Sequence, residues 1–109
     1  MGGLMFHPMK EIRMVVSGED RPFVINLLDK VKAGGYTIIS NISGKGRHGF
    51  RESHFMFNDT ENLLMIMTVV PADKVEAILA GLQTLFERRS GVMLVSDVSV
   101  IRREHFSTP

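Results

Sequence analysis

Three glycines are interleaved with three potentially cationic side chains in residues 43–50, directly after an apolar, β-branched run. The cationic residues are Lys45, Arg47 and His48. Glycines allow positive φ and expose backbone N–H groups, while lysine and arginine add charge, so this composition suits a phosphate or another small oxyanion. The glycine order matches neither the Walker pattern nor the dinucleotide fingerprint, and a glycine-rich hairpin with solvated charges would have the same composition. The segment therefore predicts an anion site without naming the anion.

The composition of the chain limits the classes of function. With 109 residues, of which 44% are hydrophobic, the chain is large enough for one globular domain. The formal net charge of +1 gives no global attraction to nucleic acid, so no nucleic-acid partner is expected. The absence of cysteine excludes disulfides, thiolate metal sites and cysteine catalysis. No apolar run is long enough to span a membrane, and we expect a cytoplasmic protein that is not membrane-embedded.

Hydrophobic periodicity predicts four strands and two helices. The strands are expected at residues 11–16, 36–42, 63–70 and 92–101. One helix is expected from Pro22 to the glycine pair at 34–35, and the other from Pro71 to Phe86, because apolar residues recur there at helical spacing. The order βαββαβ is typical of the ferredoxin-like α+β fold, an antiparallel sheet with two helices on one face.

The third predicted strand, residues 63–70, has Thr68 as its only polar residue. An antiparallel strand with one face in water should alternate apolar and polar residues. We therefore expect the sheet face away from the helices to be buried against other copies of the chain. A central strand with one tolerant face would also explain the pattern, but an oligomer accounts better for so large an apolar patch.

Four segments occur in the order and spacing found in the PII signalling proteins, and the chain resembles that superfamily over residues 9–104. These segments are residues 9–12, 44–47, 69–73 and 100–102. The resemblance implies a ferredoxin-like homotrimer that binds adenine nucleotides in clefts between subunits and signals through a mobile loop, here about residues 47–61. Residues 1–8 are then expected to be a flexible leader, and residues 105–109 a C-terminal tail.

The resemblance also implies which residues contact the nucleotide phosphates. They are Gly44, Lys45, Gly46, Arg47, Ser90, Gly91, Arg102 and Arg103. Lys45 replaces an aromatic residue of the family, and the segment around residues 89–92 lacks the family's aspartate and lysine. Arg89 is expected to restore part of the missing charge, and Arg103 to substitute for a second family arginine.

An adenine ring needs an apolar slot, which the second or third strand is expected to supply. The candidates are Ile38, Ile39, Val69 and Val70. Residues 43–50, followed by residues 55–59, most resemble the carboxysome-associated PII-like proteins, which bind adenine nucleotides together with bicarbonate. The residues expected to bind bicarbonate or another small anion are Asn41, Ser43, Lys45, Arg47 and His48.

His48 replaces a glutamine that in the family senses magnesium and 2-oxoglutarate. Sensing of 2-oxoglutarate is therefore not expected, and a role for magnesium stays open. His54 and His105 lack the spacing of metal ligands, so no structural metal is predicted. No catalytic cofactor is expected either, only ADP, ATP or AMP and bicarbonate as ligands.

The sequence thus predicts a regulatory sensor in inorganic-carbon metabolism rather than an enzyme. Nucleotide and bicarbonate would change the affinity of the loop at 47–61 for a partner, such as a bicarbonate transporter or a carboxysome-related protein. Two alternatives stay open. One is a hydrolase of phosphate esters or acyl phosphates on the same fold, with Arg47 and Asn41 at the substrate and weak ATPase activity included; the other is a CutA-like trimer linked to metal tolerance.

Overall fold

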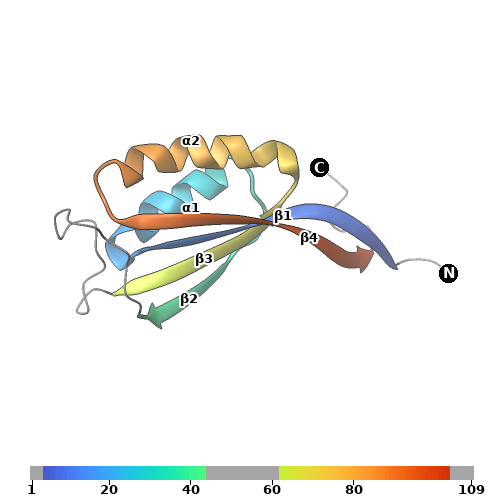
Figure 1. Ribbon diagram of the computed structural model, residues 1–109, viewed down its shortest axis with the longest axis horizontal. Coiled ribbons are helices and arrows are strands. Elements are labelled where there is room, and N and C mark those ends of the chain that lie inside the picture. The colour runs from blue at the N-terminus through green and yellow to red at the C-terminus, as the bar shows by residue number, and fades with distance from the viewer. Residues whose placement is uncertain (1–3, 44–61, 104–109) are drawn as a thin grey trace.

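The computed structural model describes residues 4–43 and 62–103. Its elements are β1 Leu4–Ser17, α1 Arg21–Lys30, β2 Thr37–Ile42, β3 Leu63–Val70, α2 Val75–Phe86 and β4 Gly91–Arg103, with 3₁₀ turns at Gly18–Asp20 and Ala72–Lys74. The strands form one sheet in the order β2-β3-β1-β4, and every neighbouring pair is antiparallel. Both helices cover the same face of this sheet (Figure 1). The predicted ferredoxin-like α+β fold is confirmed.

Local chemistry explains where α1 begins and ends. Pro22 lies in its first turn, where a missing N–H costs no helical hydrogen bond. After the helix, Lys32 adopts a φ of 59°, the left-handed conformation that commonly ends helices. Lys74 Nζ donates hydrogen bonds to the carbonyl oxygens of Val31, at 2.9 Å, and Lys32, at 3.0 Å. The lysine thereby satisfies backbone acceptors beyond α1 and ties them to the start of α2.

The hydrophobic core lies between the sheet and the two helices. Ile12 and Met14 of β1, Ile66 of β3, and Ile78 and Leu82 of α2 are completely buried there. Each such side chain contributes about 1.5–3 kcal/mol through its burial. This packing fixes the strands, and with them the turns at the strand ends.

Thr68, the only polar residue of β3, lies on the face covered by the helices. It is 3% exposed, and its Oγ1 donates a hydrogen bond of 2.8 Å to the carbonyl oxygen of Gly35. Cross-strand partners share a face, so the register defines the open face of the sheet. Its apolar side chains are Val15, Ile39, Met65, Met67, Val69, Val92 and Leu94. The same register also places Glu11, Arg13, Thr37 and Ser96 on this face, so the open face combines an apolar row, Val92, Val15, Met65 and Ile39, with rows that carry polar and charged side chains.

β1 begins seven residues before the strand start that periodicity predicts. Residues 4–8, assigned above to a leader, pair with residues 99–103 of β4. These ends of the two strands extend past the helices (Figure 1), and Leu4, Phe6 and Ile101 are more than half exposed. The strand is longer than predicted because β4 supplies a hydrogen-bonding partner over its whole length.

Candidate functional site

Four strand ends meet at one edge of the sheet. Because neighbouring strands are antiparallel, β1 and β2 end at the edge where β3 and β4 begin. The turn at Gly18–Asp20 and the connection from α2 to β4 lie at this edge as well. The end of β2 and the start of β3, which residues 44–61 connect in the sequence, also lie at this edge. The fold thus gathers several loops that are far apart in the sequence.

A cavity of about 610 Å³ opens at this edge. Its lining is mainly polar and comes from Ser17, Gly18, Glu19, Arg21, Ser40, Asn41, Asn62, Leu63, Leu64 and Arg89. Two guanidinium groups face one carboxylate, and hydroxyl and amide groups fill much of the remainder. This chemistry suits an anion that also accepts neutral hydrogen bonds, such as a phosphate or a carboxylate-like ion.

A bulge at the end of β2 brings two polar residues to the cavity. The pairing of β2 with β3 shifts between Ser40 and Ile42, so that Asn41 is the extra residue. Asn41 has a φ of 58°, which asparagine tolerates better than most residues. Both Ser40 and Asn41 therefore line the cavity instead of pointing to opposite faces of a regular strand.

Gly18 holds the turn after β1 against the start of β3. Its N–H donates a hydrogen bond of 2.6 Å to the carbonyl oxygen of Asn62. A Cβ at position 18 would lie 3.2 Å from that oxygen, tighter than an ordinary contact. A glycine thus allows this close approach without a shift of the Asn62 backbone, and the hydrogen bond connects two walls of the cavity.

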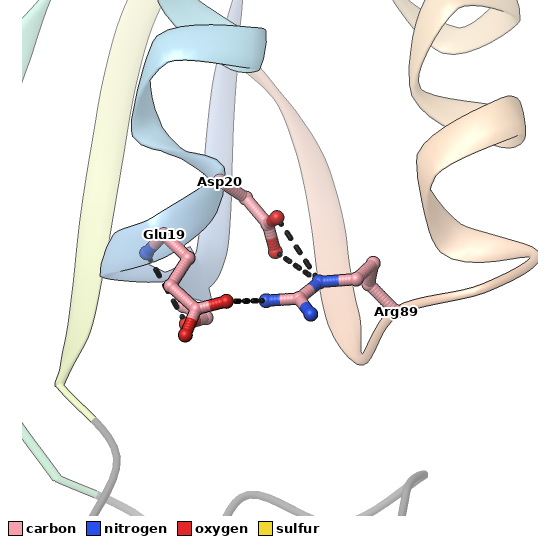
Figure 2. A network of polar contacts seen from close by, with 4 residues as sticks. Glu19, Asp20 and Arg89 are labelled. Carbon is pink, nitrogen blue, oxygen red and sulfur yellow. Dashed lines mark hydrogen bonds and ion pairs between the residues drawn. The ribbon is translucent and has the colours of Figure 1, made fainter.

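Arg89 connects the turn before β4 with the turn after β1 (Figure 2). Its Nε lies 3.0 Å from both carboxylate oxygens of Asp20, and its Nη2 lies 3.0 Å from Oε1 of Glu19. The Asp20 side chain is 10% exposed, whereas that of Glu19 is 79% exposed. The hydrogen bond and charge of Asp20, followed by those of Glu19, raise the pKa of Arg89. The guanidinium is therefore charged at every physiological pH.

Two residues singled out in the sequence line the cavity: Asn41, predicted to bind a small anion, and Arg89, expected to restore charge at the phosphate site. Ser43 is exposed just beyond the end of β2, and Ser90 and Gly91 follow Arg89 into β4. Gly44, Lys45, Gly46, Arg47 and His48, together with the loop predicted at 47–61, lie outside the described residues. Of the two glycine-containing segments, the structure therefore places Ser43 of the first and residues 89–91 of the second at the same edge of the sheet.

Arg102 and Arg103 lie at the opposite end of β4 from this cavity. At about 3.3 Å per residue, the strand separates Gly91 from Arg102 by about 35 Å. One chain therefore does not bring the two predicted phosphate-binding segments together.

The four candidates for the adenine slot lie on two different faces of the sheet. Val70 is completely buried, and Ile38 packs against the same core, so both are covered by the helices. Ile39, 44% exposed, and Val69 lie on the open face. None of the four lines the cavity.

Glu19, Arg21 and Asn62 line the cavity but were not among the residues predicted to bind ligand. The available signal was topological. In a βαββαβ sheet the residues after the first and second strands and before the third share one edge, and those residues are polar here.

Within residues 4–43 and 62–103, no three histidine or acidic side chains are placed to hold a metal ion together. In the same part of the chain, neither helix has the length and hydropathy needed to cross a membrane.

Comparison with known families and structures gives consistent matches. The family model of nitrogen regulatory protein P-II matches residues 9–105. A comparison with curated proteins finds none that matches. The apo structure of CPII from Thiomonas intermedia K12, a nitrogen regulatory PII-like protein, is 36% identical with a TM-score of 0.80, and the match covers 91% of this chain and 98% of CPII.

CPII from the same organism bound to ADP, AMP and bicarbonate is 38% identical to this chain, with a TM-score of 0.75. That match covers 88% of this chain and 96% of CPII. A PII-like signalling protein from Thermus thermophilus is 24% identical with a TM-score of 0.68, over 91% of this chain and 93% of that one. At this identity the likeness extends to the fold alone.

Proposed function

The chain belongs to the nitrogen regulatory protein P-II family, and on this premise we propose that it is a PII-like sensor that binds an adenine nucleotide together with bicarbonate. The observation that carries the proposal is the likeness to CPII, whose structures hold ADP, AMP and bicarbonate at 38% identity to this chain. The family is regulatory, and we propose that this member acts by binding and not by catalysis.

The cavity at the sheet edge supports an anionic ligand. It combines Arg21 and Arg89 with the neutral donors Asn41 and Asn62. Charge-assisted hydrogen bonds of about 1.5–3 kcal/mol each are strong enough for a sensor of micromolar to millimolar affinity. In the proposal Gly44, Lys45, Gly46, Arg47 and His48 complete this anion site.

The geometry also supports a ligand that binds between subunits of a homotrimer. Because about 35 Å separates Gly91 from Arg102 along β4, Arg102 and Arg103 reach the phosphate site of another chain more readily than their own. The apolar open face supplies a surface for that association, with Ile39 and Val69 as the described candidates for contact with adenine. A second copy of the chain thereby supplies the residues that one copy lacks.

We further propose that residues 47–61 are the part of the protein that a partner reads. The partner would be a bicarbonate transporter or a carboxysome-related protein in the cytoplasm, and the response would report inorganic carbon together with the energy state. A ligand changes such an interaction only if it binds one state of the protein more tightly than the other.

Isothermal titration of the full chain with ADP, AMP and ATP, each with and without bicarbonate, tests the proposal. We expect saturable binding of at least one adenine nucleotide and tighter binding in bicarbonate. Phosphate-release assays with ATP and acetyl phosphate run alongside to separate a sensor from a hydrolase. No heat with any combination, or steady phosphate release with multiple turnovers, would contradict the proposed function.

A further inference from the structure

We propose that Glu19 is a built-in competitor of the anionic ligand for Arg89, the residue expected above to restore charge at the phosphate site, and that the ligand displaces it. The inference rests on the proposed function and assigns a role to a residue pair within that site. The ligand group is either the terminal phosphate of the nucleotide or bicarbonate, because both present negatively charged oxygens to a guanidinium.

The two carboxylates that hold Arg89 differ in how easily they can leave. Asp20 is buried and contacts Nε through both of its oxygens, at 3.0 Å each. Glu19 is exposed and contacts only Nη2. An exposed ion pair is weak because water solvates both groups once they separate, whereas a buried carboxylate loses far more when its partner is removed. Asp20 therefore acts as a fixed anchor and Glu19 as an exchangeable partner.

Arg89 lines the cavity, and its guanidinium has more N–H donors than its two carboxylate partners use. It carries five N–H groups, and within the described part of the chain its Nη1 makes no hydrogen bond (Figure 2). When Glu19 moves away, Nη1 and Nη2 together offer a pair of donors for an oxyanion, while Asp20 still holds Nε in place. The cation need not be reoriented, which limits the entropy lost on binding.

The charges around the cavity favour the same exchange. Arg21 lines the cavity and forms no ion pair with another described residue. With Glu19 in contact, the two arginines and the two carboxylates sum to zero. Replacing Glu19 by bicarbonate keeps this sum at zero, and replacing it by a terminal phosphate adds less negative charge than binding that phosphate beside Glu19, where like charges would lie together.

The variant Glu19→Gln tests the inference by calorimetry of the full chain in two arms. One arm titrates ADP, and the other titrates bicarbonate into the chain saturated with ADP. We expect the dissociation constant in one arm to fall about two- to fivefold, the size expected from removing an exposed ion pair. A change in the first arm assigns Arg89 to the phosphate, and a change only in the second arm assigns it to bicarbonate.

Glu76→Gln is the matched control, because Glu76 is an exposed carboxylate of α2 that does not line the cavity, and its loss changes the net charge equally. In an Arg89→Gln background the effect of Glu19→Gln should disappear. If the Arg89→Gln chain does not fold, the comparison of Glu19→Gln with Glu76→Gln still tests the inference.

Wild-type binding of ADP with unchanged affinities for Glu19→Gln in both arms overturns the inference and leaves the proposed function standing. Equal tightening by Glu19→Gln and Glu76→Gln also overturns it, because net charge alone would then explain the effect. A wild-type chain that binds no adenine nucleotide overturns both.

Discussion

Asp20 and Glu19 follow one another in the sequence and share one arginine, but their surroundings give them different tasks. Asp20 is buried and fastens the turn before β4 to the turn after β1. Glu19 is exposed and contributes little to that connection. A carboxylate that binds Arg89 therefore stabilises the fold at position 20, whereas at position 19 it can be replaced at the guanidinium by water or, in our proposal, by a ligand.

We expect Asp20→Asn to lower the free energy of unfolding by about 1–2 kcal/mol, because it removes a charge-assisted hydrogen bond whose arginine remains partly solvated. Urea denaturation measures the change. Glu19→Gln is the control and should lower the free energy of unfolding by less than about 0.5 kcal/mol. Equal losses for the two variants would show that the difference in burial has no energetic consequence.

A change of pH near neutrality does not neutralise Arg89, so it does not break the ion pairs of Arg89 by deprotonating the guanidinium. Its pKa is raised by Asp20 and Glu19, so the stabilisation from its charged form is fully present below the ordinary arginine value and is lost only as the pH rises through the raised value. That range lies above physiological pH. On the proposed account, ligand concentration and not arginine titration governs the exchange.

At the scale of elements, the end of α1 carries a local conflict that sequence periodicity does not reveal. Lys32 has a φ of 59°, a conformation that costs an L-residue with a side chain about 1 kcal/mol. Both backbone groups of Lys32 are nevertheless hydrogen-bonded: its N–H donates to the carbonyl oxygen of Asp29, and its carbonyl oxygen accepts from Lys74 Nζ. These hydrogen bonds stabilise a backbone conformation that is unfavourable for an isolated lysine.

We expect Lys32→Gly to raise the free energy of unfolding by about 0.5–1 kcal/mol, because glycine adopts positive φ without a Cβ clash. Thermal and urea unfolding measure it. Lys30→Gly, in the last turn of the same helix, is the paired variant and should lower the free energy of unfolding by about 1 kcal/mol. A loss of stability in both variants would mean that the backbone conformation at Lys32 gives no preference for glycine.

The number, type and order of the elements follow from hydrophobic period and turn residues, since both are local signals. Two features of the strands are not local. The bulge at Asn41 is defined only by the register against β3, and the pairing of residues 4–8 exists only because β4 extends that far. Neither feature can be predicted from its own segment of sequence, because each depends on how the neighbouring strand pairs with it.

The candidate site was only partly predictable for the same reason. Asn41 was predicted to bind a small anion and Arg89 to restore charge at the phosphate site, but Glu19 and Arg89 are separated by 70 positions and meet only through the sheet topology. Ile38 and Val70 look like other apolar strand residues, and only the helix layer distinguishes them from Ile39 and Val69. Residue type indicated the chemistry, while the face and edge of the sheet decided which residues could take part.

For the molecule as a whole, the proposed nucleotide binding requires a second copy of the chain. The open face exposes Ile39, Val92 and Leu94, at 44%, 38% and 48%. Val92, Val15, Met65 and Ile39 follow one another across the four strands, and an exposed apolar row of this kind is typical of an interface. The proposed nucleotide cleft lies between copies, so assembly and ligand binding should fail together.

The variant Leu94→Glu tests this dependence most directly, because it places a charge on the open face without touching the core or the cavity. Leu79→Glu, on the exposed side of α2 and 43% exposed, is the matched control. Light scattering after gel filtration reports assembly, and calorimetry reports ADP binding. We predict that the wild type and Leu79→Glu are trimers that bind ADP, whereas Leu94→Glu is a folded monomer that does not; a monomeric Leu94→Glu chain that binds ADP with wild-type affinity would contradict the account.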